Sequence, residues 1–352
     1  MQITSQVVIV GGGLSGLTLA YLLDRKNIKV TLIEASSRLG GRIQTQQGVL
    51  HTPLELGATW FSEMHPNLLF LMEELGVQKF PQFSKGKSLF QTKSFEPAQE
   101  FFVPESNEPS YRMVKGTQSL IDTLFQKTKF EKMHFNTRIK VIKDLDNSIE
   151  LESTAGDKFY AKQVFLCLPP QLVAKKIEIY PELPQDLKDL MPNVQTWMAG
   201  SIKFVLEYSI PFWRENGYSG MLYSHSGIIS EMYDHTNFEG DKFGFTGFLN
   251  GGATSYSQDL RKELVLKQLN QLLGSQASTP LAYFDKVWTD DFILAGNQSN
   301  QRPHQNNGHP LFHQGYLGNK LFFGGTETAS QSSGYMEGAV ISALSLVKCV
   351  EV

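Results

Sequence analysis

Three glycines near the amino terminus, Gly11, Gly13 and Gly16, have the G-x-G-x-x-G spacing of a turn that holds a diphosphate. The first glycine allows a tight turn, the second lets a pyrophosphate approach the backbone, and the third lets a helix pack closely on its strand. Leu14 and Ser15 follow at the expected start of that helix, where free N–H groups and the helix dipole favour negative charge. The pattern therefore predicts a dinucleotide site.

Residues 34–42 carry the acid and the cations that such a site would use. Glu34 lies about 20 residues past the glycines, where a carboxylate can accept hydrogen bonds from a ribose diol and disfavours a 2'-phosphate. After Ala35, an RxGGR pattern adds two guanidinium groups and a flexible backbone, which suit further phosphate or the edge of a flavin. The residues of this pattern are Arg38, Gly40, Gly41 and Arg42. A nicotinamide enzyme does not need them, so the sequence favours FAD.

A second glycine-rich block, LFFGGTETASQSSGYMEGAVISALSLV, occupies residues 321–347. It reads as a buried strand followed by a backbone that can approach a ligand at Gly325. A further helix is expected to open at Gly334. Its dipole would stabilise the negative charge that a flavin gains on two-electron reduction.

One lysine, Lys203, stands inside the otherwise apolar strand expected over residues 200–208. A buried lysine is costly unless it has a partner or a task. A cation beside a flavin has such a task, because reduced flavin first gives one electron to oxygen and a positive charge stabilises the superoxide. The alternation of a strand equally allows a solvent-facing lysine at a sheet edge.

The elements that would position these groups form a strand–helix–strand unit, with strands at 7–10 and 30–33 and a helix at 15–23. A helix is expected within 111–127, capped by Thr117, and strands at 135–144, 148–153 and 158–168. Strands at 212–223, 243–249 and 282–288, with an amphipathic helix at 260–273, would complete an antiparallel sheet.

The expected fold is α/β, with a Rossmann-like FAD-binding domain from residues 1–78, 112–193 and 297–352. The inserted α+β substrate domain would comprise residues 79–111 and 194–296. A length of 352 residues suits about two domains.

Composition excludes several other classes. Hydrophobic residues make up 41% and charged residues 19%, and the net charge of −3 gives no reason to expect nucleic acid. Because no apolar run reaches about 18 residues and no signal peptide stands out, no membrane span is expected. Two cysteines are too few for a disulfide framework, which fits a cytoplasmic location. The histidines at 304, 309 and 313 lack the spacing of a metal motif.

Taken together, the chain resembles the flavin amine oxidase superfamily of monoamine, polyamine and L-amino acid oxidases, as a short soluble member. The resemblance covers nearly the whole chain and implies noncovalent FAD. In the family, the lysine that matches Lys203 holds a water beside flavin N5, and the tyrosine that matches Tyr335 flanks the substrate amine. The segment GATW lies beside the flavin ring, although Trp60 has a packed core tryptophan as its alternative reading.

The resemblance also implies which residues contact FAD. The GATW segment contributes Gly57, Ala58, Thr59 and Trp60. Ile139 would lie against the adenine, Glu327 would contact the ribityl or phosphate region, and the backbone at Met336 would face the ring. The implied reaction is hydride transfer from the carbon next to an amine nitrogen to flavin N5, which gives an imine, followed by reoxidation by oxygen to hydrogen peroxide.

Some family features are missing. Asn297 stands where several members have the cysteine that attaches the flavin, Gln298 stands near the second aromatic of the amine cage, and Ser332 replaces another aromatic. Two alternatives therefore stay open: an FAD-dependent desaturase or porphyrinogen-type dehydrogenase with another acceptor, and a flavin-binding protein without amine turnover. The expected partners are a small-molecule substrate and oxygen or another acceptor, while the oligomeric state stays open.

Overall fold

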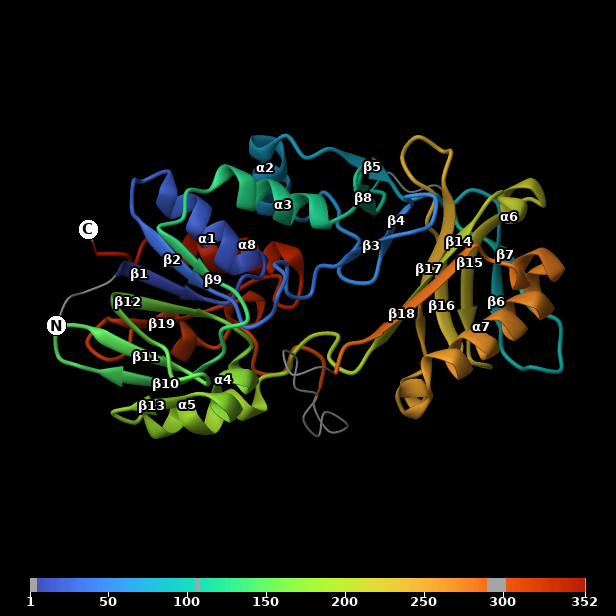
Figure 1. The fold of residues 1–352 in the computed structure, drawn as a ribbon. Coiled ribbons are helices and arrows are strands. Elements are labelled where there is room, and N and C mark those ends of the chain that lie inside the picture. Colours follow the sequence, from blue (N-terminus) through green and yellow to red (C-terminus); the bar gives the residue numbers. More distant parts are fainter. Residues whose placement is uncertain (1–4, 105–107, 290–301, 352) are drawn as a thin grey trace.

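The computed structural model describes residues 5–104, 108–289 and 302–351, which form two lobes side by side (Figure 1). Over these residues, one lobe is built on an eight-stranded sheet and the other on a seven-stranded sheet. Two short hairpin-like pairs, β3 (Thr45–Gln47) with β4 (Pro53–Glu55) and β5 (Lys79–Pro81) with β8 (Tyr111–Met113), lie between them. The mixed α/β architecture expected from the sequence is confirmed.

The eight-stranded sheet is organised around β1 (Ser5–Val10), which pairs in parallel with β2 (Val30–Ile33) and β12 (Lys158–Cys167). Val7, Val8, Ile9 and Val10 are almost fully buried, as the parallel strand of a sheet covered on both faces requires. The strands of this sheet are β1 (Ser5–Val10), β2 (Val30–Ile33), β9 (Lys132–His134), β10 (Ile139–Asp144), β11 (Ile149–Ser153), β12 (Lys158–Cys167), β13 (Glu178–Tyr180) and β19 (Leu321–Gly324).

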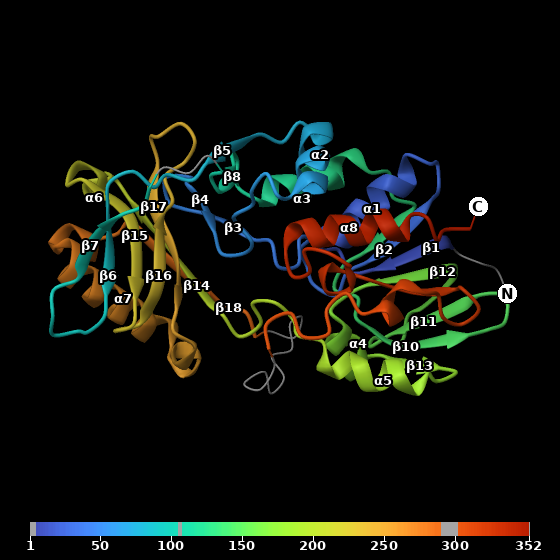
Figure 2. The same ribbon diagram turned by 180° about the vertical axis from the view of Figure 1, so that it is seen from behind.

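Helices cover both faces of this sheet, as Figure 2 shows from behind. One face packs against α1 (Leu14–Asp24), α2 (Pro66–Leu75), α3 (Gln118–Lys127) and α8 (Met336–Leu346). The other face packs against α4 (Pro170–Lys176) and α5 (Gln185–Leu190). The amino-terminal ends of α1 and α8 therefore belong to the same layer, although they lie more than 300 residues apart in the sequence.

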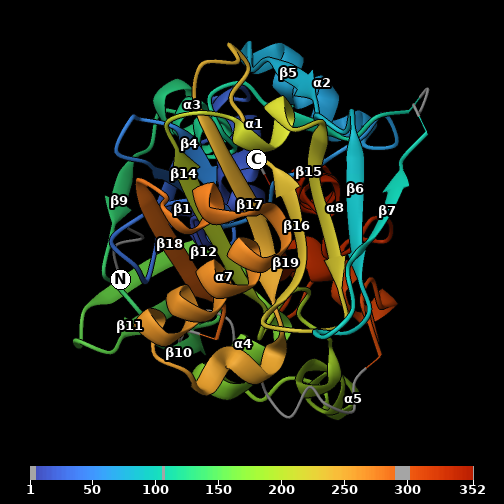
Figure 3. The same ribbon diagram turned by 90° about the vertical axis from the view of Figure 1, so that its right-hand side faces the viewer.

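The second lobe is a sheet with one face covered by a helix. Its strands are, in spatial order, β18 (Ala282–Val287), β14 (Ile202–Tyr208), β17 (Phe243–Leu249), β16 (Ile229–Asp234), β15 (Tyr218–Ser224), β6 (Lys87–Gln91) and β7 (Gln99–Phe102). Figure 3 shows α7 (Gln258–Leu273) lying across this sheet. Short helix α6 (Phe212–Glu215) leads into β15.

Strand β14 shows how this sheet divides its side chains. Its even-numbered residues 202, 204 and 206 pack in the core beneath α7. The odd-numbered residues lie on the opposite face, where Val205 packs against Leu54 and Leu56 of the hairpin segment. Lys203 shares this inner face, and it is only 2% exposed. The alternative of a solvent-facing edge lysine is therefore wrong.

The structure corrects several details of the sequence reading. Thr117 makes no side-chain cap, because its own backbone is already helical at φ −67° and ψ −27°. The first N–H groups of α3 are instead bound by side chains from the hairpin: Thr117 N donates to Glu55 Oε1 at 2.6 Å and Gln118 N donates to Thr45 Oγ1 at 3.0 Å. Tertiary contacts thus replace the local cap.

The second sheet also differs from the expected antiparallel one. β15 and β6 pair in parallel, so the sheet is mixed, and β6 and β7 come from a segment without a clear strand signal. Residues 212–215 form a helix in place of the expected start of a strand, and from it the Trp213 indole and the Arg214 guanidinium both donate to the buried carboxylate of Asp234. β16 was not expected at all. The domain boundaries at residues 79, 112, 194 and 297 stay a prediction.

None of the helices in the described residues has the length and apolar character needed to cross a membrane. The cytoplasmic location expected from the cysteine content stays a prediction.

Candidate functional site

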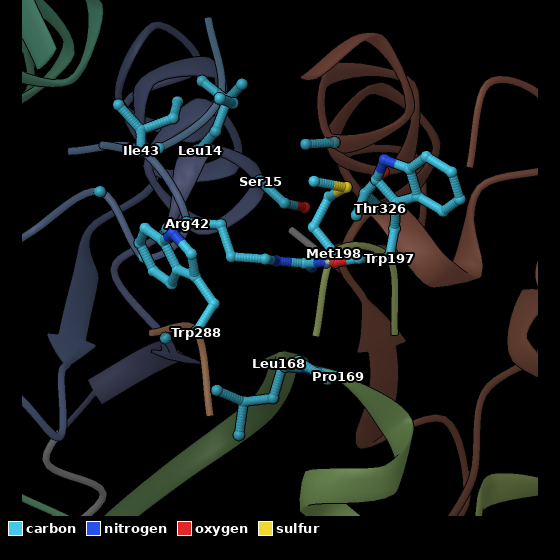
Figure 4. A pocket seen from close by; sticks show the side chains of 18 of the residues that line it. Leu14, Ser15, Arg42, Ile43, Leu168, Pro169, Trp197, Met198, Trp288 and Thr326 are labelled. Atoms are coloured by element: carbon cyan, nitrogen blue, oxygen red, sulfur yellow. Dashed lines mark hydrogen bonds between the residues drawn. The ribbon is translucent and has the colours of Figure 1, made fainter. Parts of the chain in front are cut away.

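A cavity of about 510 Å³ is lined by residues from both sheets. Figure 4 shows Arg42 reaching across it toward Trp197 and Met198, with Trp288 on the opposite side of this view. Nearly all the residues that the sequence assigns to cofactor or substrate line it. These are Gly11, Gly13, Leu14, Ser15, Glu34, Ala35, Arg38, Gly40, Gly41, Arg42, Gly57, Ala58, Thr59, Trp60, Ile139, Lys203, Gly325, Glu327, Gly334, Tyr335 and Met336.

The three glycines of the first turn have three different surroundings. Gly11 has a φ of +109°, which favours glycine. A Cβ on Gly13 would meet nothing within 4 Å, since this position faces open space in the cavity. A Cβ on Gly16 would lie 2.0 Å from the carbonyl oxygen of Gly11, so Gly16 serves packing and does not line the cavity.

Glu34 directly follows β2 and closes this turn. One carboxylate oxygen accepts the Gly12 N–H at 2.6 Å, and the other accepts both the N–H and the hydroxyl of Ser36 at 2.8 Å. Nearby, the buried Ser15 hydroxyl lines the cavity without a nitrogen or oxygen partner among the described residues, its neighbour being the Cys167 thiol. A buried polar atom facing an open glycine turn is the surrounding that a diphosphate would complete.

The two arginines of RxGGR have separate tasks. Arg38 donates to the carbonyl oxygens of Leu39 at 3.2 Å, Gly41 at 2.5 Å and Ile43 at 2.9 Å, which fastens the loop. Arg42 instead reaches across the chain to the C-terminal block and forms a two-pronged ion pair with Glu327, at 2.5 and 2.9 Å. Glu327 is fully buried. This pair joins the first and last segments of the cavity wall.

Lys203 Nζ donates to the Gly57 carbonyl oxygen at 2.7 Å and to the Thr59 hydroxyl. The ammonium group also lies over two rings, 4.9 Å from the centroid of Trp60 and 5.5 Å from that of Phe248. Thus the GAT segment, which the family resemblance places beside the flavin ring, holds the lysine directly.

Burial changes the ionisation of this lysine. It lowers the pKa of Lys203 to about 7, and the carboxylates of Glu55 and Glu231 oppose that shift. Burial likewise raises the pKa of Glu55 to about 7, against hydrogen bonds from Thr117 and Thr45 and the charge of Lys203. A cation in the cavity wall therefore titrates near neutral pH.

Aromatic side chains surround the opposite part of the cavity. Tyr335 is 44% exposed, and its ring lies 6.0 Å from that of Trp197 and 5.8 Å from that of His304. Trp197 and His304 stack on each other at 4.3 Å. Trp197 was missed by the sequence reading because the segment before β14 carries no motif.

Trp60 both lines the cavity, as a residue beside a flavin would, and packs against neighbouring side chains, as a core tryptophan would. Its ring lines the cavity and packs edge-on against Tyr233 at 4.9 Å, while its indole N–H donates to Gln82 at 2.9 Å. Tyr233 and Glu231 of β16 also line the cavity. No sequence signal pointed to these two residues, because β16 itself was not expected.

Other candidates lie elsewhere. Arg112 is buried and donates to His235 and to the Thr236 carbonyl oxygen. Arg302 is exposed. Neither arginine lines the cavity. Of the histidines, His304 stacks on an indole and His313 contacts the Thr328 carbonyl oxygen at 2.9 Å. Among the described residues no cluster of His, Cys, Asp or Glu has the form of a metal site. The expected positions Asn297 and Gln298 lie outside the described residues.

Comparison with known proteins adds an independent line of evidence. The model of a family described as flavin containing amine oxidoreductase matches residues 14–99 and 91–350. A relative from Dictyostelium discoideum, a probable flavin-containing monoamine oxidase A, is 24% identical over 453 residues, covering 99% of this chain and 98% of the relative.

Solved structures show the same fold. A variant of putrescine oxidase superposes with a TM-score of 0.83 at 19% identity, covering 99% of each chain. Cyclohexylamine oxidase from Brevibacterium oxydans IH-35A superposes with a TM-score of 0.83 at 18% identity, covering 98% of each chain.

Proposed function

This chain belongs to the flavin-containing amine oxidoreductase family, and we propose that it is an FAD-dependent oxidase that converts small-molecule amines to imines and passes the electrons to oxygen. The observation that carries this proposal is the buried Lys203, whose ammonium group lies in the wall of the cavity, held by Gly57 and Thr59. Burying an ammonium group costs stability, so a lysine at this position indicates a role in function.

The cavity fits FAD at several points. The open space at Gly13, the Ser15 hydroxyl without a nitrogen or oxygen partner and the start of α1 suit the diphosphate, and Glu34 suits a ribose diol. Ile139 lies in the wall where the adenine is expected. At the other end, the start of α8 with Gly334, Tyr335 and Met336 would face the ring, where its dipole favours negative charge.

When bound, FAD supplies an acceptor for a hydride from the carbon next to the amine nitrogen. The chain's own contribution is position and charge. Trp60, Phe248 and Tyr233 give the cavity apolar walls that exclude water and fix the orientation of a substrate. Lys203 holds a positive charge at the wall, where oxygen can receive electrons. Arg42 and Glu327 tie the first and last segments together, so that these groups keep their spacing.

The test is direct. Holoenzyme mixed anaerobically with a panel of primary amines should lose the absorbance of oxidised flavin, and admission of air should restore it with about one peroxide per amine consumed. A control panel of polycyclic substrates tests the desaturase alternative. If an amine reduces the flavin but the reduced flavin is reoxidised only by an artificial dye, without formation of peroxide, the oxidase part of the proposal is contradicted. A flavin that no amine bleaches would contradict amine oxidation itself.

We also propose that FAD is held without a covalent bond. Cys167 is the one cysteine of the described residues that lines the cavity, and burial raises its pKa to about 12. The thiol therefore stays protonated and is a weak nucleophile. Acid denaturation should release all the yellow colour into the supernatant, whereas flavin left in the protein pellet would refute noncovalent binding.

A further inference from the structure

The side-chain amide of Gln82 joins the cavity wall to the second sheet. Its Oε1 accepts the indole N–H of Trp60 at 2.9 Å, and its Nε2 donates to the backbone carbonyl oxygens of Asp234 at 2.8 Å and Phe83 at 3.0 Å. An indole N–H can only donate and a carbonyl oxygen can only accept, so these three partners fix the orientation of the amide. Because Gln82 does not itself line the cavity, it holds Trp60 from outside.

The backbone around this amide is itself firmly held. The N–H of Gln82 donates to the Ser110 carbonyl oxygen at 2.8 Å. The buried carboxylate of Asp234 accepts the indole N–H of Trp213 at 2.7 Å and pairs with Arg214 through hydrogen bonds of 2.7 and 2.8 Å. The partners of the Gln82 amide are therefore locked by their own hydrogen bonds, which makes them a rigid support for the indole.

On its other side, the Trp60 ring meets the ammonium group of Lys203. The Nζ atom lies 4.9 Å from the ring centroid, within the range at which a ring face attracts a cation. An ammonium group has three N–H donors, and the Gly57 carbonyl oxygen and the Thr59 hydroxyl accept two of them. Within the described chain, the rings of Trp60 and Phe248 are the groups that face the remaining part of the ammonium. The position of Trp60 therefore affects how well the charge is stabilised.

We propose that Gln82 is a positioning residue for the reaction with oxygen: its amide keeps the Trp60 ring against Lys203 and so preserves the ammonium charge at the cavity wall. This inference rests on the proposed use of oxygen as the electron acceptor. Once its N–H has lost the Gln82 acceptor, the indole is free to take other rotamers. Because a ring face stabilises an ammonium group and not a neutral amine, release of the ring favours loss of the proton from Lys203.

Other titratable groups also act on Lys203, and they lie on or next to β4, β8, β16 and β18. They are Glu55, Arg112, Glu231, His235 and Lys286. Burial has the largest effect on Lys203 and lowers its pKa to about 7, while the two carboxylates oppose that shift. Gln82 carries no charge and binds none of these side chains. Its replacement should therefore change the surroundings of Lys203 through Trp60.

A spectroscopic test measures this contact without turnover. The chain has four tryptophans, so holoenzyme labelled with 5-fluorotryptophan should give four fluorine resonances, and Trp60→Phe assigns the one from Trp60. That resonance should titrate with a midpoint near pH 7, and the titration should disappear in Lys203→Met. In Gln82→Met the midpoint should fall by about 0.5 to 1 pH unit, because the released ring no longer stabilises the ammonium form. An unchanged midpoint, or a Trp60 resonance that does not titrate in the parent protein, would overturn the inference.

The rate of flavin reoxidation shows whether the contact matters for the reaction. Light in the presence of a sacrificial electron donor reduces the flavin, so the measurement needs no amine, and mixing with oxygen in stopped-flow gives the rate. Gln82→Met should be about three- to tenfold slower than the parent at pH 8 and within about twofold of it at pH 6, where Lys203 is mostly protonated in both. Equal slowing at the two pH values is what a merely structural role predicts, and it would overturn the proposal.

Trp60→Phe provides a second variant, because it removes the indole N–H while the Gln82 amide keeps both of its carbonyl partners. It should reproduce the slowing at pH 8, and Gln82→Met should add less than about twofold in the Trp60→Phe background. A full further loss would show that Gln82 acts by another route, such as Tyr233, which packs on the same ring, and would overturn the role of Trp60.

Gln46→Met is the matched control. Gln46 lies on the hairpin strand β3, donates to the Gln47 carbonyl oxygen at 3.1 Å and does not line the cavity. It should leave the fluorine midpoint and both reoxidation rates unchanged. Reoxidation of the parent protein without peroxide would contradict the oxidase function, and the fluorine midpoints would then decide by themselves whether Gln82 holds Trp60 against Lys203.

Discussion

The replacement Lys203→Met tests whether the cavity lysine is kept for its charge at a cost in stability. Burial lowers its pKa from 10.5 to about 7, and each pKa unit corresponds to about 1.4 kcal/mol. Because the folded pKa lies below the unfolded one, the unfolded chain binds more protons between pH 7 and 10.5. The ionised lysine therefore costs the folded protein about 4 kcal/mol at pH 7, and this cost disappears as the pH rises to 10.5.

Methionine removes that cost but leaves the Gly57 carbonyl and the Thr59 hydroxyl without their donor, at about 1 kcal/mol each. We expect Lys203→Met to be more stable than the parent by about 2 kcal/mol at pH 7, and to lose this advantage by pH 10. Urea unfolding at both pH values, with excess FAD, measures the difference. Lys140→Met is the matched control, since this strand lysine is 41% exposed and pairs with Glu152 at the surface; its stability should change by less than about 0.5 kcal/mol.

The same variant should separate the two half-reactions. Anaerobic reduction of the flavin by an amine should stay within about threefold. Reoxidation in stopped-flow should slow by about 100-fold or more, because a nearby unit charge in a medium of effective dielectric constant near 20 stabilises an anion by a few kcal/mol. A variant that is less stable than the parent at pH 7, or one that reacts with oxygen at the parent rate, would refute the reasoning about Lys203.

Three further predictions concern the cofactor and the charges around it. Gly13→Ala should leave the stability of the FAD-free protein to urea unchanged or slightly raised, but it should weaken FAD binding in a fluorescence titration. Gly16→Ala should destabilise the fold itself by more than about 1 kcal/mol, because its Cβ would meet the Gly11 carbonyl oxygen. Equal effects of the two variants on stability would contradict the difference between the open space at Gly13 and the close packing at Gly16. Glu327→Gln leaves a partly buried guanidinium without its carboxylate and should cost about 3 kcal/mol in urea unfolding, and a loss below about 1 kcal/mol would show that the pair is unimportant. Glu55→Gln removes a carboxylate that raises the pKa of Lys203, so the fall in reoxidation rate with rising pH should move to lower pH; a shift to higher pH would contradict the coupling.

The sequence by itself determined the cofactor half of this protein. Each signal there is local: the glycine spacing of residues 11–16, an acid at the end of an apolar strand and the glycines before the last helix. Such signals work because a tight turn, an open approach to the backbone and a free helix end depend on residues within one strand–turn–helix unit. The sequence also singled out Lys203 as a candidate functional residue, since a lysine within an apolar strand interrupts its hydrophobic pattern.

Only the tertiary structure decided which side chains from the second sheet line the cavity. Trp197, Glu231 and Tyr233 come from segments without a motif, and their importance arises from strands brought together across the sheet. The Arg42–Glu327 pair likewise joins residues 285 positions apart. Strand register and the closure of one lobe on another depend on long-range packing, which local periodicity does not encode. That is why the sequence identified the flavin family, while the remaining side chains of the cavity wall emerged only from the fold.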